Sequence, residues 1–167
     1  MNIRNIGLVL FLFWFVSPIV SAGEPTNLSR YIGSTYPPLE PGLKEVSGTI
    51  IGHPIEDLTY SVAWISKGQE QMLWLTSTPS DGKKGEIIWT ILDAFTLPKY
   101  KPGETLVIGF CTLNNESDPE ILALVKYEED QEVFRHVIKA WRANRGTKKF
   151  ETIKSNGISC ANESYGE

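Results

Sequence analysis

Residues 58–75 contain two apolar runs in quick succession: Leu58-Thr59-Tyr60-Ser61-Val62-Ala63-Trp64 and, after Lys67-Gly68, Met72-Leu73-Trp74-Leu75. In the first run, large apolar side chains alternate with smaller ones, which is the period of two of a half-buried β-strand. The second run is apolar at every position, which is typical of a strand covered on both faces. Lys67-Gly68 indicates a turn. The pattern predicts two strands, with Tyr60, Val62 and Trp64 on a face toward the core.

Short runs of the same kind recur along the chain and are separated by turn-forming residues. The runs that fit a strand are residues 46–52, 105–113 and 121–127. Residues 105–113 form the most convincing buried strand. Asn144-Arg145-Gly146-Thr147 is typical of a hairpin turn, with residues 138–143 and 149–153 as its two strands. A short helix or turn is expected at 130–136.

The fold class follows from the spacing of these runs. Residues 86–95 fit either a short helix or a β-branched strand. No alternation of strands with long helical runs is present, which argues against a doubly wound sheet. We therefore expect a mainly β domain with an antiparallel sheet, as a sandwich or a half-barrel, and one or two short helices. An α+β domain is a close alternative.

The first 22 residues have the three parts of a secretory signal peptide. Arg4 supplies the positive charge, residues 6–16 form an uncharged apolar run, and Ala22 precedes the expected cleavage site. A transmembrane anchor is the alternative, but this apolar run is short for a bilayer about 30 Å thick. We expect a periplasmic or secreted protein that has no membrane contact after cleavage.

The remaining chain has the length of one domain. Residues 23–45 are rich in proline and glycine and predict an irregular N-terminal arm, and residues 46–167 predict a single globular domain. Loss of Arg4 with the signal peptide changes the net charge from −4 to −5. An acidic chain gains nothing from phosphate contacts, so nucleic acid is not an expected partner.

Two cysteines, Cys111 and Cys160, are present. In an exported protein such a pair predicts a disulfide, which would fasten the C-terminal tail to the core. Asn27, Asn115 and Asn162 each begin an Asn-x-Ser sequon, which is a glycan acceptor if the host is eukaryotic.

Few residues suit catalysis. Nucleophile-elbow, phosphate-loop and dinucleotide fingerprints are absent from the sequence, and the two histidines are too few to predict a metal site. His53 with Asp57, His136, and Asp93 in an apolar stretch are weak candidates for acid–base chemistry. An exposed turn for His53, a structural role for His136 and a hydrogen-bonded role for Asp93 are the favoured interpretations. No cofactor is expected.

Four tryptophans remain after residue 22, namely Trp64, Trp74, Trp89 and Trp141. Tryptophan suits both cores and binding surfaces, so each is a candidate for a ligand or partner contact. The favoured function is a small exported binding protein, such as an inhibitor or an envelope accessory factor, rather than an enzyme. The alternatives are a hydrolase that uses His53 or His136 with a carboxylate, and a small-ligand carrier with a tryptophan-lined pocket.

Overall fold

The computed structural model describes residues 27–80 and 87–166. The chain there forms one short 3-10 helix, η1 (Leu28–Arg30), and strands arranged in three antiparallel sheets. Sheet A has the order β1 (Thr35–Tyr36), β5 (Trp89–Thr96), β4 (Glu70–Pro79), β3 (Leu58–Lys67), β2 (Leu43–Ile50). Sheet B has the order β12 (Lys149–Ile153), β11 (Val137–Asn144), β9 (Ile121–Lys126), β6 (Glu104–Ile108). Sheet C has the order β10 (Val133–Phe134), β13 (Ile158–Ala161), β7 (Cys111–Leu113), β8 (Glu116–Ser117). The expectation of a mainly β, antiparallel protein is confirmed.

The hairpin of β3 and β4 is the centre of sheet A, as its sequence predicts. The two strands pair from Leu58 opposite Pro79 to Lys67 opposite Glu70, and Gly68 takes the left-handed φ of +59° that their turn requires. β4 is buried on both faces: Leu73 and Leu75 belong to one hydrophobic cluster, and Met72 and Trp74 to another. The uninterrupted apolar run at 72–75 arises because both faces of this strand are covered.

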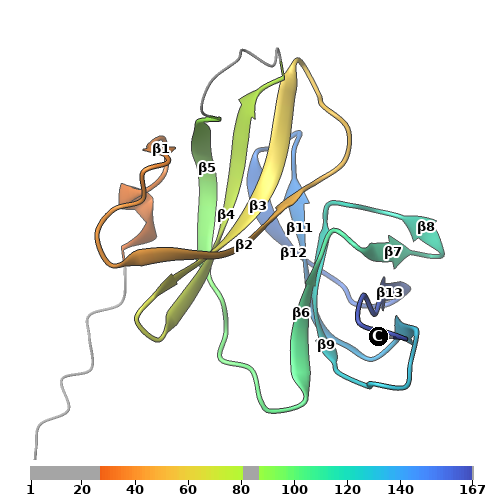
Figure 1. The fold of residues 1–167 in the computed structure, drawn as a ribbon. Helices are drawn as coiled ribbons and strands as arrows, with labels where there is room; N and C mark the ends of the chain where they lie inside the picture. The colour runs from red at the N-terminus through yellow and green to blue at the C-terminus, as the bar shows by residue number, and fades with distance from the viewer. Residues whose placement is uncertain (1–26, 81–86, 167) are drawn as a thin grey trace, which may run out of the picture.

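The outer face of sheet A is covered by the N-terminal arm. The aromatic rings of Tyr31 and Tyr36 lie 5.2 and 5.4 Å from the ring of Trp74. Asn27 caps η1 by accepting a hydrogen bond from the Ser29 N–H, and β1 pairs with β5. From Asn27 onward the arm is therefore an ordered cover that includes η1 and β1, and Figure 1 shows it in orange beside sheet A.

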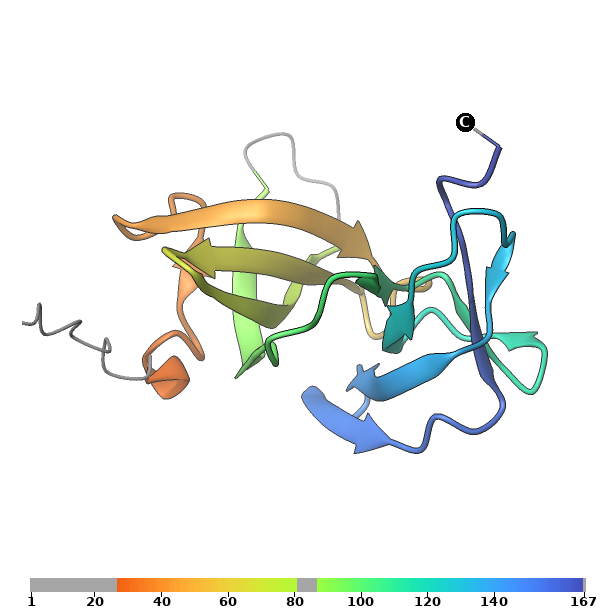
Figure 2. The same ribbon diagram turned by 90° about the horizontal axis from the view of Figure 1, so that it is seen from below.

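Sheet B lies between sheet A and sheet C because β9 buries both of its faces. Leu122 and Leu124 pack into the cluster shared with the inner face of sheet A. Ile121, Ala123 and Val125 pack into a second cluster with sheet C. The hairpin of β11 and β12, joined at residues 145–148, is confirmed as predicted. In Figure 2 the strands of sheet A lie to one side of those of sheets B and C.

One segment differs from the sequence prediction, and the structure decides two others that the sequence left open. The predicted strand at 105–113 is wrong as a single strand: it divides into β6 in sheet B and β7 in sheet C. The chain changes sheets at Gly109, whose φ is +80° and where a Cβ atom would lie 3.3 Å from Thr49 Cγ2. The ambiguous segment 86–95 forms strand β5 from Trp89, and residues 130–136 form a turn and β10.

The expected signal peptide, residues 1–22, lies outside the described residues. Within the described ranges 27–80 and 87–166, no helix has the length and apolar character needed to cross a lipid bilayer.

Candidate functional site

The two histidines lie at opposite ends of β11. His136 directly precedes the strand, whereas the His53 carbonyl accepts a hydrogen bond of 2.6 Å from Arg145, just beyond the strand's other end. At the usual rise per residue, an eight-residue strand holds these positions about 25 Å apart. Both histidines are exposed. The structure therefore does not bring them together in a shared site.

The two candidate carboxylates have separate surroundings. Asp57 is exposed in the turn before β3 with a left-handed φ of +59°, and its carbonyl accepts a hydrogen bond from Ser80 N–H. Asp93 is partly buried on β5 and accepts hydrogen bonds from the Phe150 N–H at 2.8 Å and the Lys149 ammonium at 3.3 Å. The Asp93 carboxylate thereby links sheet A to β12 of sheet B, which is a structural use of the side chain.

The four tryptophans do not gather in one pocket. Trp74 and Trp141 are 1% and 4% exposed and lie in different hydrophobic clusters. Trp89 is half-buried beneath the N-terminal arm. Trp64 packs on the cluster between sheets A and B, and its Nε1 donates a hydrogen bond of 3.1 Å to Gln71. Trp64 also lines a surface cavity between sheets A and B.

A network of ion pairs joins sheet B to the loop after β2. Arg142 binds Asp118 and Glu120, and Arg145 binds Glu120 at 2.7 Å and the His53 carbonyl at 2.6 Å. Burial lowers the pKa of Arg142, but its hydrogen bonds to the two carboxylates outweigh burial and raise the pKa above its usual value. The four side chains bind one another, and Arg145 also binds the His53 carbonyl, so the network is a structural clamp.

The cavity that contains Trp64 is a groove between the edges of sheets A and B, with a volume of about 260 Å³. Sheet A contributes Ser47 and Thr49 from β2 and Trp64 from β3, and sheet B contributes four consecutive residues, 105–108, from β6. We call this cavity the β6 groove. Figure 1 shows the end of β6 next to β2, where Gly109 approaches Thr49 closely.

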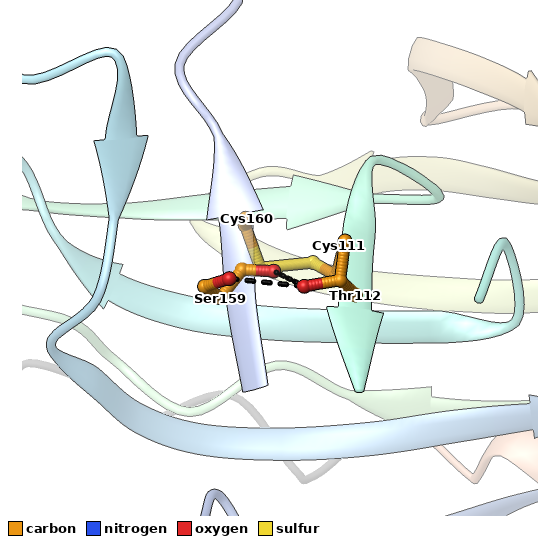
Figure 3. The surroundings of a disulfide bond; sticks show 4 residues. All are labelled: Cys111, Thr112, Ser159 and Cys160. Atoms are coloured by element: carbon orange, nitrogen blue, oxygen red, sulfur yellow. Dashed lines mark hydrogen bonds between the residues drawn. A yellow bond between two sulfur atoms is a disulfide. The ribbon is translucent and has the colours of Figure 1, made fainter. Parts of the chain in front are cut away.

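The third wall of the β6 groove comes from the C-terminal tail, residues 161–164, together with Tyr127 and Phe134. The tail is anchored by the Cys111–Cys160 disulfide, which joins directly opposed residues of β7 and β13. Figure 3 shows this bond beside the hydrogen-bonded pair of Thr112 and Ser159. The predicted disulfide is present, and it positions the tail residues that follow it.

Asn162 holds the rest of the tail in place. It is 7% exposed, donates from Nδ2 to the Gln131 carbonyl at 2.9 Å and accepts from Ser164 N–H and Oγ. The side-chain amide of this sequon is therefore used inside the protein. Asn115, in contrast, is exposed in the turn between β7 and β8.

A second hollow of about 550 Å³ lies beside His136 and is more open than the β6 groove. Its polar lining includes Arg135, Glu128 and Asn156. The described residues contain no group of three or more histidine, cysteine, aspartate or glutamate side chains that is able to hold a metal ion.

Sequence reasoning missed most of the β6 groove. Trp64 was a candidate, but Ser47, Thr49 and residues 105–108 carried no signal beyond strand-forming composition. Their proximity depends on the way the edge of sheet A meets the edge of sheet B, and no local pattern reports that. Comparison of this chain with protein-family models, with curated proteins and with solved structures finds no match.

Proposed function

We propose that this protein is an exported binding protein whose β6 groove receives a segment of a partner protein. The observation that carries the proposal is a groove at the junction of three sheets, with apolar side chains such as Trp64, Leu106 and Phe134 beside polar ones such as Ser47 and Thr49. A mixed lining with an aromatic residue is typical of protein recognition surfaces. Export is supported by the leader-like residues 1–22 and by the disulfide.

The shape of the groove favours a polypeptide over a small ligand. Small-molecule sites usually enclose most of the ligand in a cavity of about 300–1,000 Å³. The β6 groove has a volume of about 260 Å³ and is partly open to solvent. A chain segment can enter such a groove sideways and leave one face in solvent.

The two alternative functions receive less support from this geometry. A hydrolase needs a base, an orienting carboxylate and a substrate cleft in mutual contact. His53 and His136 are far apart, and Asp93 is already bound to β12. A tryptophan-lined carrier needs its tryptophans around one cavity, but Trp74 and Trp141 are enclosed in separate clusters.

Site-specific photocrosslinking in exporting cells tests the proposal. A photoreactive phenylalanine analogue replaces Thr105, which lines the groove, or Thr152, which is exposed on β12 outside it. We expect a discrete crosslinked protein from position 105 and none from position 152. The additional substitution Trp64→Ala should weaken the crosslink from position 105. Equal crosslinking at both positions, or none at either, would contradict the proposal.

A further inference from the structure

The pairing of β6 with β9 shows which backbone groups of β6 face away from sheet B. The Gly109 N–H donates to the Ile121 carbonyl at 3.1 Å, and the Tyr127 N–H donates to the Gly103 carbonyl at 2.8 Å. These bonds fix the odd-numbered residues as those whose backbone groups point to β9. In an antiparallel pair the hydrogen-bonding direction alternates along the strand. The N–H and C=O groups of Leu106 and Ile108 therefore point away from β9.

These outward groups face the β6 groove. All of residues 105–108 line it, although their side chains alternate between the two faces of sheet B. Consecutive residues of a strand share a cavity wall only when the edge of that strand forms the wall. Among the described strands, β6 ends sheet B and pairs with β9 alone. The described residues therefore leave the outward edge of β6 without a partner strand.

The groove also offers separate surroundings for side chains on the two faces of an added strand. Leu106 and Ile108 pack toward the core shared with sheet A, which is the side of Trp64. Val107 packs toward sheet C, which is the side of Phe134. A strand that paired with β6 would alternate its side chains between these two apolar walls. This combination of a free edge and alternating pockets is what strand addition requires.

The part of the β6 edge that lines the groove, residues 105–108, lacks the usual obstacles to pairing with another strand, whereas Glu104 begins the strand outside the groove lining. Natural sheet edges are commonly protected by proline or by charged side chains. Residues 105–108 contain neither, and one charged residue, Glu163, lines the groove. Glu163 is exposed and forms no ion pair within the described part of the chain. A lysine or arginine side chain on a bound segment would complement the negative charge of Glu163.

We propose, building on the proposed binding function, that the partner segment binds as an added β-strand on the free edge of β6. It hydrogen-bonds to the backbone of Leu106 and Ile108. Its side chains are apolar at alternate positions, and it carries a lysine or arginine opposite Glu163. The occupant is thus an extended, basic polypeptide segment rather than a helix or a folded surface.

The test uses random ten-residue peptides displayed on phage and selected on the purified protein, followed by synthesis of one selected peptide. Backbone N-methylation then removes one peptide N–H at a time. We expect affinity to fall by about tenfold or more at every second position and to change little between them, because alternate N–H groups of an edge strand bond to its neighbour. A series without this period of two would overturn strand addition.

Charge recognition is tested with Glu163→Gln and the matched control Glu116→Gln on β8, which is exposed and lies outside the groove. We expect Glu163→Gln to weaken binding of the selected peptide by about threefold at low salt and the control to leave it unchanged. Equal effects of the two variants would show that the partner segment needs no lysine or arginine opposite Glu163.

The outcomes separate the two proposals. If position 105 gives a crosslink but the N-methylated peptides show no period of two in their affinities, the proposed binding function is retained and strand addition is rejected. If no peptide is selected and position 105 gives no crosslink, both proposals fail. A concentration-dependent dimer that crosslinks through position 105 would make a second copy of this chain the occupant and would contradict a basic foreign segment.

Discussion

At the scale of single residues, the cluster beneath the N-terminal arm contains an unusual feature. Tyr31 Oη and Trp74 Nε1 are buried without a hydrogen-bond partner among the described residues. A buried polar atom of this kind loses its bonds to water and gains nothing in return. The aromatic rings themselves are well packed, since their centroids lie 5.2 Å apart. Packing of the two rings therefore stabilises the folded protein, whereas burial of their two unpaired polar atoms destabilises it.

Tyr31→Phe should therefore make the protein more stable. The substitution keeps the ring against Trp74 and removes a hydroxyl that has no partner. We expect the free energy of unfolding to rise by about 1 kcal/mol, measured by urea denaturation. The control is Tyr165→Phe at the exposed C-terminal end, which should change little. A loss of stability in Tyr31→Phe would show that the hydroxyl is satisfied in solution.

Tyr36 should make stability depend on pH in the alkaline range. Burial and the nearby Glu45 carboxylate raise its pKa to about 12, although a hydrogen bond with Thr76 opposes them. The unfolded chain ionises this phenol near its ordinary pKa of 10. Between pH 10 and 12 the folded state therefore holds a proton that the unfolded state has lost, and stability falls as pH rises.

Urea unfolding at pH 8, 9, 10 and 11 checks this expectation. The native protein should lose stability above pH 10 more steeply than Tyr36→Phe, which lacks the titrating group, and the two should change in parallel below pH 9. Identical slopes for both proteins above pH 10 would show that Tyr36 ionises normally in the folded state.

At the scale of elements, the disulfide and the arginine clamp each tie together segments that are distant in sequence. The disulfide joins β7 to β13 across a separation of 49 residues. The clamp joins the end of β11 to the loop after β2 through the Arg145–His53 contact. The disulfide fixes β13, whose continuation at residues 161–164 forms a wall of the β6 groove.

Removal of the disulfide by Cys111→Ser with Cys160→Ser should cost about 4 kcal/mol, because it releases a loop of about 50 residues in the unfolded chain. Hydrogen–deuterium exchange should also rise at residues 158–164, which lose their covalent anchor. Because both cysteines are 1% exposed, a reductant added to the native protein without denaturant should have a much smaller effect. Unchanged stability in the double variant would contradict the assigned role.

Arg145→Ala should destabilise the protein by about 2 kcal/mol. The change leaves the Glu120 carboxylate, whose side chain is 15% exposed, with one cationic partner in place of two. The matched control is Lys154→Ala, an exposed residue just after β12, which should shift the denaturation midpoint little. Equal shifts in the two variants would show that the clamp contributes nothing specific.

At the scale of the whole molecule, the protein is a stack of layers: the N-terminal arm, sheet A, sheet B and sheet C. Each interface is filled by one hydrophobic cluster, and each sheet except the outermost is covered twice. Each layer packs on its direct neighbours, so removal of an outer layer exposes the apolar face of the next one. Among the described residues, the arm contributes the two-residue strand β1 to sheet A.

Deletion of residues 23–34 should uncover the outer face of sheet A. The deletion removes Tyr31, which is 2% exposed and packs on Trp74, and it leaves Tyr36 as the remaining tyrosine ring against that tryptophan. We expect a loss of about 3 kcal/mol from the buried side chains that are removed, a red shift of tryptophan fluorescence and binding of a hydrophobic dye. Deletion of residues 165–167 is the control. A truncated protein that keeps its fluorescence and stability would contradict the layered arrangement.

Local sequence patterns were sufficient for much of this architecture. The alternation at 58–64 and the apolar run at 72–75 marked β3 and β4, and Asn144–Thr147 marked the turn between β11 and β12. The cysteine pair marked the disulfide. These features depend on interactions within a few residues or, for the cysteines, on chemistry that admits a single pairing.

Other features arose from packing between distant segments. Residues 105–113 had the composition of one strand, but the approach of Thr49 to Gly109 and the pairing of Cys111 with Cys160 divide them between two sheets. The separation of His53 from His136 and the β6 groove likewise depend on where strand edges meet. Side-chain alternation records which face of a strand is buried, whereas the choice of neighbouring strands is made by long-range contacts. For that reason the strands were visible in the amino-acid order, and the candidate binding site became visible in the folded molecule.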